Sequence, residues 1–193
     1  MCELIATFKQ AFKFLLVFTI ITGVIYPGAV TVLGQTLFSH EANGSLIKKD
    51  GMIIGSELIG QSFIEEKYFW ARPSMTGDYP YNALGSAGSN QSPAGETLEK
   101  TMAKRVKILQ EAHKGQTEAI PVDLVTASAS GLDPHISVAS AIYQAERVAK
   151  CRNLEVEEVV SLIKEHTQGR QLGFLGEERV NVVSLNLSLD DLE

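Results

Sequence analysis

The sequence predicts an α+β protein in which a single N-terminal transmembrane helix precedes one soluble domain of helices packed on a small β-sheet. Three patterns support this fold class. The segment from Phe14 to Ser39 contains no Asp, Glu, Lys or Arg. Later segments repeat their apolar residues with helical spacing, and others alternate apolar and polar residues as strands do. The length of 193 residues suits one soluble domain rather than two.

The uncharged segment is long enough to cross a bilayer, because about 20 helical residues span a hydrocarbon core of about 30 Å. A cleaved signal peptide is the main alternative, but its apolar region would end after about 7–15 residues at a small-x-small site. Here the apolar residues continue through Val24-Ile25-Tyr26 to Leu33, and no Ala-x-Ala follows. We therefore expect a retained anchor in contact with membrane lipid.

Basic residues near the span predict its orientation. Lys9 and Lys13 precede it, whereas the nearest basic residues beyond it are Lys48 and Lys49. The positive-inside rule then predicts a short cytoplasmic N-terminus over residues 1–13, a transmembrane helix and its exit over 14–39, and an extracytoplasmic soluble domain over 40–193. Cys2 and Cys151 would face opposite compartments, so no disulfide is expected.

Small or polar residues repeat along one flank of the predicted transmembrane helix. They are Thr19, Gly23, Pro27, Thr31 and Gly34. Such a flank allows another helix to approach closely, which predicts a docking face. Gly, Pro and Thr are also common in membrane helices generally, so the pattern alone leaves both interpretations open. Pro27 should kink the helix because it lacks a backbone donor.

The first part of the soluble domain combines a hairpin, a long loop and a helix. The apolar pair Leu46-Ile47 and the apolar run Met52-Ile53-Ile54 flank the turn at residues 48–51 and predict a hairpin. The stretch from Ala71 to Gln91 is rich in Gly, Ser, Pro and Asn and predicts an ordered loop. Ser92-Pro93 resembles a helix start, and the helix that follows should end at Gly115.

The second part is expected to hold two more helices and a final strand. A loop over Thr126 to Asp133 should lead into a helix that begins at Pro134, with Asp133 as its cap. A third helix carries apolar residues at Val156, Val159, Val160 and Ile163, and should end at Gly169. Strict alternation from Val183 to Leu189 predicts a half-buried strand.

Charge and motifs exclude several classes of function. The net charge of −6 gives no basic surface for nucleic acid, so no nucleic-acid partner is expected. No phosphate-binding glycine loop is present. The four histidines lack the spacing of a metal site, so we expect no metal and no intrinsic cofactor.

Two groups of residues are candidates for chemistry. Ser128 or Ser130 could act as a nucleophile with His135 as base and Asp123 or Asp133 as its orienting group. However, neither serine lies in a Gly-x-Ser-x-Gly elbow, and triads are assembled from distant segments, so a structural role in the loop is adequate. On the helix that follows, Gln144 and Arg147 could help clamp an anion, although a solvated helix face is the commoner explanation.

Short motifs occur in a fixed order over nearly the whole chain. They are Gly55-Ser56, Leu58 to Gln61, Phe63, Tyr68-Phe69, Arg72-Pro73-Ser74, Tyr81-Asn82, Ser89-Asn90, Asp123 to Ser137, Gln144, Arg147 to Ala149, Arg152, Phe174 to Glu177 and Arg179 to Val182. In these motifs and their order the chain resembles the C subunit family of the Kdp-type potassium-transporting ATPase. One departure is Ala87, where the family usually has glycine.

The resemblance implies a non-catalytic subunit of a potassium pump in a bacterial inner membrane. Its implied partners are a channel-like potassium-binding subunit, a P-type ATPase subunit and a very small membrane peptide. It further implies a catalytic chaperone that raises the ATP affinity of the ATPase subunit, with Gln144 and Arg147 at the positions linked to nucleotide. Arg72, Ser89 and Asn90, with the loop carrying Asp123 to His135, are implied as structural or partner-contacting residues.

An extracytoplasmic domain would meet no ATP, so we expect the effect on ATP affinity to be indirect, through the assembled membrane helices. The acidic surface of the domain would mildly concentrate cations above the channel subunit. Two other hypotheses remain: a membrane-tethered binding domain without a transporter, and a membrane-anchored hydrolase that uses the serines named above.

Overall fold

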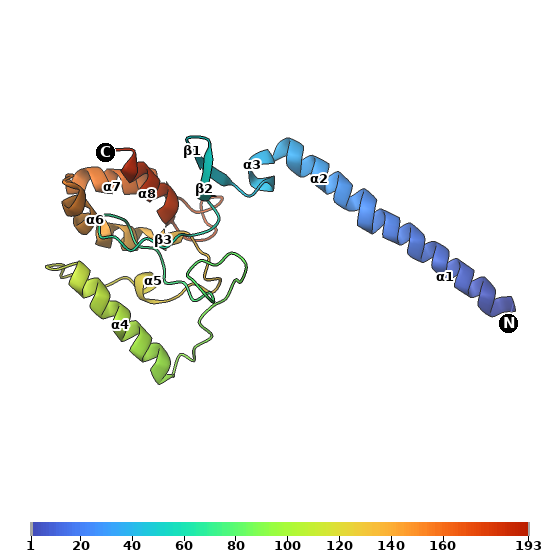
Figure 1. Cartoon of the computed structure of the whole chain (residues 1–193), viewed down its shortest axis with the longest axis horizontal. Coiled ribbons are helices and arrows are strands. Elements are labelled where there is room, and N and C mark those ends of the chain that lie inside the picture. The colour runs from blue at the N-terminus through green and yellow to red at the C-terminus, as the bar shows by residue number, and fades with distance from the viewer. Residues whose placement is uncertain (1, 193) are drawn as a thin grey trace. The chain divides into compact units, whose positions relative to one another are not determined.

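The computed structural model describes residues 2–192 and divides near Leu46 into an N-terminal helical unit and a C-terminal α+β unit. The N-terminal unit comprises α1 (Cys2–Ile20), a π-helical turn (Ile21–Ile25), α2 (Tyr26–Leu37) and the short α3 (Ser39–Ala42). From Glu3 to Leu37 it is long and apolar enough to span a membrane, and its span is unburied within the protein. Figure 1 shows α1, the π-helical turn and α2 as one continuous helix, followed by the short α3. The expected anchor helix is present.

Pro27 distorts this helix in a specific way. A proline removes one backbone donor and its ring crowds the preceding turn. The turn before Pro27 widens into the π-helical segment, in which the N–H of Tyr26 donates to the carbonyl of Ile21. A π-helical turn relieves the crowding without ending the helix. Where a kink was expected, the structure shows a local widening of the helix.

The C-terminal unit begins with the predicted hairpin. Strands β1 (Leu46–Lys49) and β2 (Met52–Ser56) pair around Asp50 and Gly51. These two residues have φ of 52° and 78°. A two-residue turn with both φ values positive suits strand twist, and Asp-Gly adopts it at low cost.

A second, three-stranded sheet organises the main core. Its strands are β3 (His135–Ser137), β4 (Thr167–Gln168) and β5 (Arg179–Asn181), in the antiparallel order β3-β5-β4. Val180 lies at the centre, opposite both Ile136 and Thr167. Helices α6 (Val138–Arg152), α7 (Val156–Glu165) and α8 (Val182–Asp190) lie close together in the C-terminal unit (Figure 1). Apolar side chains from all three helices and the sheet form the core, with Phe69 among them.

A smaller apolar cluster lies beside the first. It joins α4 (Glu96–Ala112) and α5 (Val122–Val125) to α6 through Leu109, Leu124 and Tyr143. Between β2 and α4 the chain has no regular strand or helix, as predicted for the loop over Ala71 to Gln91.

Several predicted boundaries were wrong. The helix expected after Ser92-Pro93 begins at Glu96, because Ser92 closes a turn by accepting the N–H of Gly95. It ends at Ala112, before Gly115, and α7 ends at Glu165, before Gly169. The helix expected at Pro134 begins at Val138, because residues 135–137 pair as strand β3.

The capping residue of α6 also differs from the prediction. Ser137 caps the helix by accepting the N–H of Ser140 at 3.1 Å. The carboxylate of Asp133 instead accepts the N–H of His135 at 3.0 Å, which closes a turn before β3.

The strand predicted over Val183 to Leu189 was wrong, since this segment is helix α8. Its fully buried residues are Val182, Leu185, Asn186 and Leu189, which lie on one helical face. Asn181 starts the helix: its Oδ1 accepts the N–H groups of Val183 at 3.1 Å and Ser184 at 3.2 Å. The apolar–polar alternation was misleading because, in so short a segment, the same apolar residues also fit the spacing of one helical face.

Replacing Asn181 should therefore destabilise the C-terminal unit. Its Nδ2 also donates to the carbonyl of Glu57 at 2.7 Å. We expect Asn181→Ala to lower the free energy of unfolding by about 2 kcal/mol, because a cap and a buried donor are lost together. Asn181→Asp keeps the capping oxygens and should lose less. Chemical denaturation measures both, and equal losses would contradict the capping role.

Candidate functional site

The most concentrated polar site surrounds an irregular segment, Glu66 to Trp70, which we call the clamped segment. In the described part of the chain no strand pairs with it, and side chains take the place of one. Gln144, fully buried on α6, accepts the N–H of Trp70 at 2.8 Å and donates to its carbonyl at 3.1 Å. Asn186, 1% exposed on α8, pairs with Phe69 in the same way at 2.8 and 3.0 Å. Two amides thus reproduce the pairing of a strand partner.

Two arginines complete the clamp. Arg147, 6% exposed, donates to the carbonyls of Glu66 and Tyr68, and also to Oε1 of Gln144 at 2.9 Å. Arg152 donates from Nε to the carbonyl of Lys67 at 2.9 Å and from Nη2 to Asp190 at 2.6 Å. Together with the amides, they pair every backbone carbonyl from Glu66 to Trp70.

Arg147 is also fixed from its other sides. Its guanidinium lies 4.4 Å from the centre of the Trp70 ring, and its Nε donates to Nε2 of His113 at 3.0 Å. Burial lowers the pKa of Arg147 to about 10, which still leaves it charged at neutral pH. Nε, Nη1 and Nη2 each donate to a protein acceptor. Four of its five N–H groups are engaged in this way, so most of its donor capacity is used within the protein.

His113 is held in one neutral tautomer. Its Nε2 accepts from Arg147, so the ring proton is on Nδ1, which lies 2.9 Å from the carbonyl of Leu109. Burial lowers the pKa of His113, and the positive charge of Arg147 lowers it further. Protonation would bring two N–H groups face to face.

A hollow of about 410 Å³ opens beside this pair. Besides His113, Tyr143 and Arg147, it is lined by charged side chains of both signs: Glu66, Glu111, Lys114, Glu146 and Lys150. Three carboxylates here balance two ammonium groups and the Arg147 guanidinium, so the lining has no excess of positive charge. This balance does not favour a polyphosphate, which binds best where positive charge and free donors converge.

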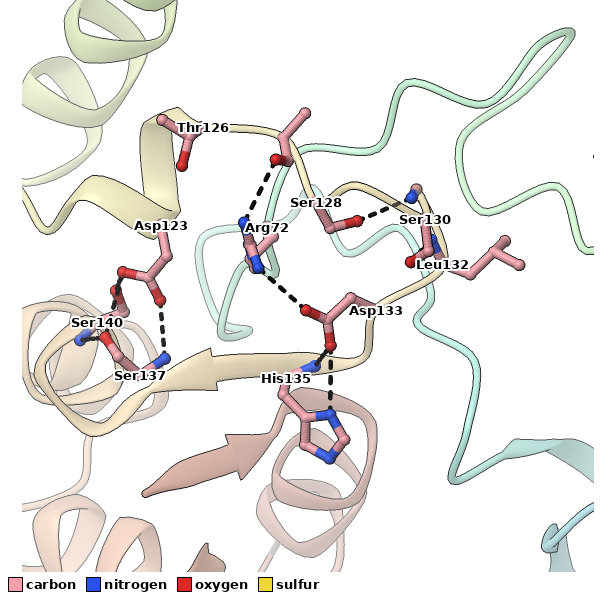
Figure 2. A network of polar contacts seen from close by, with 12 residues as sticks. Arg72, Asp123, Thr126, Ser128, Ser130, Leu132, Asp133, His135, Ser137 and Ser140 are labelled. Atoms are coloured by element: carbon pink, nitrogen blue, oxygen red, sulfur yellow. Dashed lines mark hydrogen bonds and ion pairs between the residues drawn. The ribbon is translucent and has the colours of Figure 1, made fainter. Parts of the chain in front are cut away.

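A second polar network holds the loop that leads to β3 (Figure 2). Arg72 donates to Asp133 at 3.1 Å and to the carbonyl of Ala127 at 3.3 Å. Burial alone would raise the pKa of Asp133, but hydrogen bonds from His135 and the charge of Arg72 hold it below its ordinary value. Asp123 accepts from the backbone of Ser137 at 2.8 Å and the hydroxyl of Ser140 at 2.5 Å.

The two serines considered as nucleophiles serve the same loop. Ser128 Oγ accepts the N–H of Gly131 at 2.9 Å, and Ser130 Oγ accepts the N–H of Leu132 at 3.1 Å. In Figure 2 both hydroxyls face these loop amides, while the His135 ring lies beyond Asp133. Among the described residues, neither serine hydrogen-bonds His135, so the structure does not assemble the trio.

The loop that carries Ser89 and Asn90 packs against this network through its backbone. The N–H of Ala87 donates to the carbonyl of Ser130 at 3.0 Å, which ties this loop to the segment of Ser130. Gly131 has a φ of 68°, and a side chain there would lie 2.6 Å from the carbonyl of Ala87. Ser89 accepts from Gln91, and Asn90 has a left-handed φ of 49°. These contacts shape a surface; whether a partner contacts it stays a prediction.

The proposed docking flank lies along α1, the π-helical turn and α2. Thr19, Gly23, Pro27 and Thr31 are exposed within the protein, and Gly34 is half-buried. A side chain at Gly23 would meet nothing within 4 Å. The chain itself therefore does not require glycine there, and the docking role stays a prediction.

The sequence reading missed Asn186, His113 and Trp70. Asn186 was assigned to the polar face of a strand, whereas it is a buried amide on a helix. A single Asn within the apolar segment 182–189 was the available signal, because a buried amide must find partners. His113 and Trp70 carried no pattern that linked them to Arg147.

Fold and site together define a class of protein: an α+β domain that follows one helix able to span a membrane, with polar side chains that chiefly hold its own backbone. The chain matches the family described as "KdpC: K+-transporting ATPase, c chain" over residues 8–191. It belongs to this family.

Relatives match over almost their whole length. The potassium-transporting ATPase KdpC subunit of Methylococcus capsulatus is 59% identical over 185 residues, which cover 96% of this chain and 97% of the relative. The KdpC subunit of Burkholderia ambifaria is 54% identical over 174 residues, or 90% of each chain. That of Herpetosiphon aurantiacus is 50% identical over 186 residues, or 96% of each.

The buried, neutral state of His113 predicts that the stability of the fold depends on pH. Its pKa in the folded state lies below the ordinary value of 6.5, so the unfolded state binds the proton more readily. Stability is therefore complete above about pH 6.5 and falls as the pH drops toward the folded-state pKa.

Denaturation as a function of pH tests this. His113→Gln should flatten the slope below pH 6.5, because an amide can accept from Arg147 and does not titrate. Burial also lowers the pKa of His166. His166→Gln is therefore the matched control: it should remove the contribution of His166 to the slope and leave that of His113 in place. An unchanged slope in His113→Gln would contradict the locked tautomer.

Proposed function

We propose that this chain is an accessory, non-catalytic subunit of an ATP-driven potassium uptake complex. It assembles and stabilises a channel-like potassium-binding subunit and a P-type ATPase subunit, together with a small membrane peptide. Its helix docks among theirs through the flank from Thr19 to Gly34. Membership of the KdpC family supports this role.

One structural observation carries the proposal further. The polar residues that drew attention as chemical candidates are engaged in holding loops and the clamped segment. Side chains used in this way build a fixed surface. A fixed surface suits a subunit that acts through contact with partners, because little ordering entropy is lost on binding.

The same observation supports an indirect effect on ATP. Gln144 is fully buried and pairs with Trp70, Ser140 and Arg147. We propose that Gln144 and Arg147 influence ATP affinity by maintaining the domain that the partners recognise. ATP itself binds the ATPase subunit, and this chain needs no cofactor of its own.

Two matched variants separate indirect from direct action. Gln144→Glu and Asn186→Asp each replace an amide donor of the clamp with a carboxylate, but only Gln144 lies beside Arg147. In the assembled complex, both should lower thermal stability and raise the KM for ATP together, because each leaves a buried carbonyl unpaired at a cost of about 2 kcal/mol. A KM change confined to Gln144→Glu, with unchanged stability, would indicate a nucleotide ligand instead.

Protease accessibility tests the proposed orientation. In sealed right-side-out cells, added protease should cut the domain within the irregular stretch between β2 and α4, while a tag on the N-terminus stays protected. The expectation follows from Lys9 and Lys13, which favour a cytoplasmic N-terminus. Full protection of the domain in intact cells, with cleavage after lysis, would reverse the orientation and reopen direct contact with ATP.

A further inference from the structure

The π-helical turn leaves one backbone carbonyl of the membrane-spanning helix without a helical donor. In an α-helix the carbonyl of Thr22 would accept the N–H of Tyr26, but that N–H donates to the carbonyl of Ile21 instead. A continued π-helical pattern would offer the N–H of residue 27, which is proline and has none. Both helical donors that could reach the carbonyl of Thr22 are therefore missing.

The depth of this carbonyl in the membrane makes a partner necessary. Thr22 follows Lys13, the last charged residue before the uncharged segment, by nine positions, which is about 13 Å along a helix. A hydrocarbon core is about 30 Å thick, so the carbonyl lies near its middle, where lipid offers no donor. Among the described residues no side chain replaces the lost donor: the hydroxyl of Thr22 itself donates to the carbonyl of Phe18 at 2.7 Å.

The surface beside the carbonyl is open. In a trans peptide the carbonyl oxygen lies on the same side of the bond as the next Cα, so residue 23 determines what covers it. Residue 23 is glycine, and a side chain there would meet nothing within 4 Å. Another helix can therefore approach the backbone closely at this turn.

We propose that a helix of another subunit of the transporter lies against this turn and donates a hydrogen bond from a polar side chain to the carbonyl of Thr22. The inference rests on the proposed function, which supplies the partner. Ser, Thr, Asn and Gln carry donors of the required kind and form such bonds between membrane helices. The bond fixes the register of docking, because it forms only where donor and carbonyl meet.

Pro27→Ala tests the missing donor. Alanine restores the N–H of residue 27 and should return the turn to regular α-helix, in which the carbonyls are paired internally. In membranes that hold the other subunits, association of the full chain should weaken about threefold to tenfold, the range of hydrogen bonds between membrane helices. A purely steric docking flank predicts no loss, because alanine is smaller than proline. Unchanged or tighter association would overturn the proposal.

Gly23→Leu and Gly28→Leu form a matched pair. A side chain at either glycine would meet nothing within 4 Å. Only position 23 adjoins the carbonyl of Thr22, whereas Gly28 lies on another side of the helix, because five residues make about 1.4 turns. Gly23→Leu should weaken association about tenfold or more, and Gly28→Leu should not. Equal losses would indicate a general need for close packing and would overturn the proposal.

The same measurements need a control for folding. All three substitutions lie in the N-terminal helical unit, outside the α+β unit that begins near Leu46. The melting temperature of the α+β unit should therefore stay unchanged in each variant. Loss of association that accompanies a lower melting temperature in Pro27→Ala and Gly23→Leu would overturn the proposal.

The ¹³C shift of the Thr22 carbonyl gives a direct measurement of its hydrogen bond. Labels on threonine carbonyl carbon and glycine nitrogen select the peptides Thr22-Gly23 and Thr76-Gly77, and Gly77→Ala removes the second. Assembly with the other subunits should move the Thr22 signal downfield, as acceptance of a hydrogen bond does. An unmoved signal, or one that builds up from water magnetisation, would overturn the proposal.

The two hypotheses fail separately. If the wild-type chain never associates with the transporter, the proposed function fails. If the chain associates and the Thr22 signal does not move, only the inferred hydrogen bond fails.

Discussion

The backbone from Glu66 to Trp70 runs between α6 and α8 without a strand beside it, yet its polar groups need partners. The side-chain amides of Gln144 and Asn186 pair with the backbone of Trp70 and Phe69. Arg147 and Arg152 donate to the carbonyls of the preceding residues. An unpaired buried backbone group costs about 1–3 kcal/mol. Phe69 can therefore be buried in the core only because the clamp pairs the backbone around it. The other parts of the domain are arranged around it.

This constraint also explains why apparent chemistry proves to be architecture. A glutamine three residues before an arginine on one helix resembles a site for an anion. In the fold, the Gln144 amide is directed at Trp70, and the Arg147 guanidinium is divided among backbone carbonyls, an imidazole and an indole face. The serines of the second network likewise satisfy loop amides. Polar side chains replace regular secondary structure in this domain because its loops are long and its sheets small.

Local signals predicted the elements whose formation depends on neighbours in sequence. The hairpin followed from Asp50-Gly51, whose φ preferences suit the turn, and α7 followed from the spacing of Val156, Val159 and Ile163. The prediction of α8 as a strand was wrong because, over so few residues, its apolar positions fit both the two-residue repeat of a strand and the 3.6-residue repeat of a helix. Which period applies was decided by the cap at Asn181 and by burial of Asn186 against Phe69.

The sequence by itself determined the anchor, the α+β class and the family. Each depends on composition or on residue order, and the uncharged stretch from Phe14 to Ser39 needs no tertiary contact to be apolar. Only the tertiary structure decided what Gln144, Arg147 and Asn186 do. The backbone groups of the clamped segment that they bind lie some 74 to 117 positions away along the chain. A hydrogen bond forms where atoms meet in space, and no local pattern records which distant backbone an amide will reach.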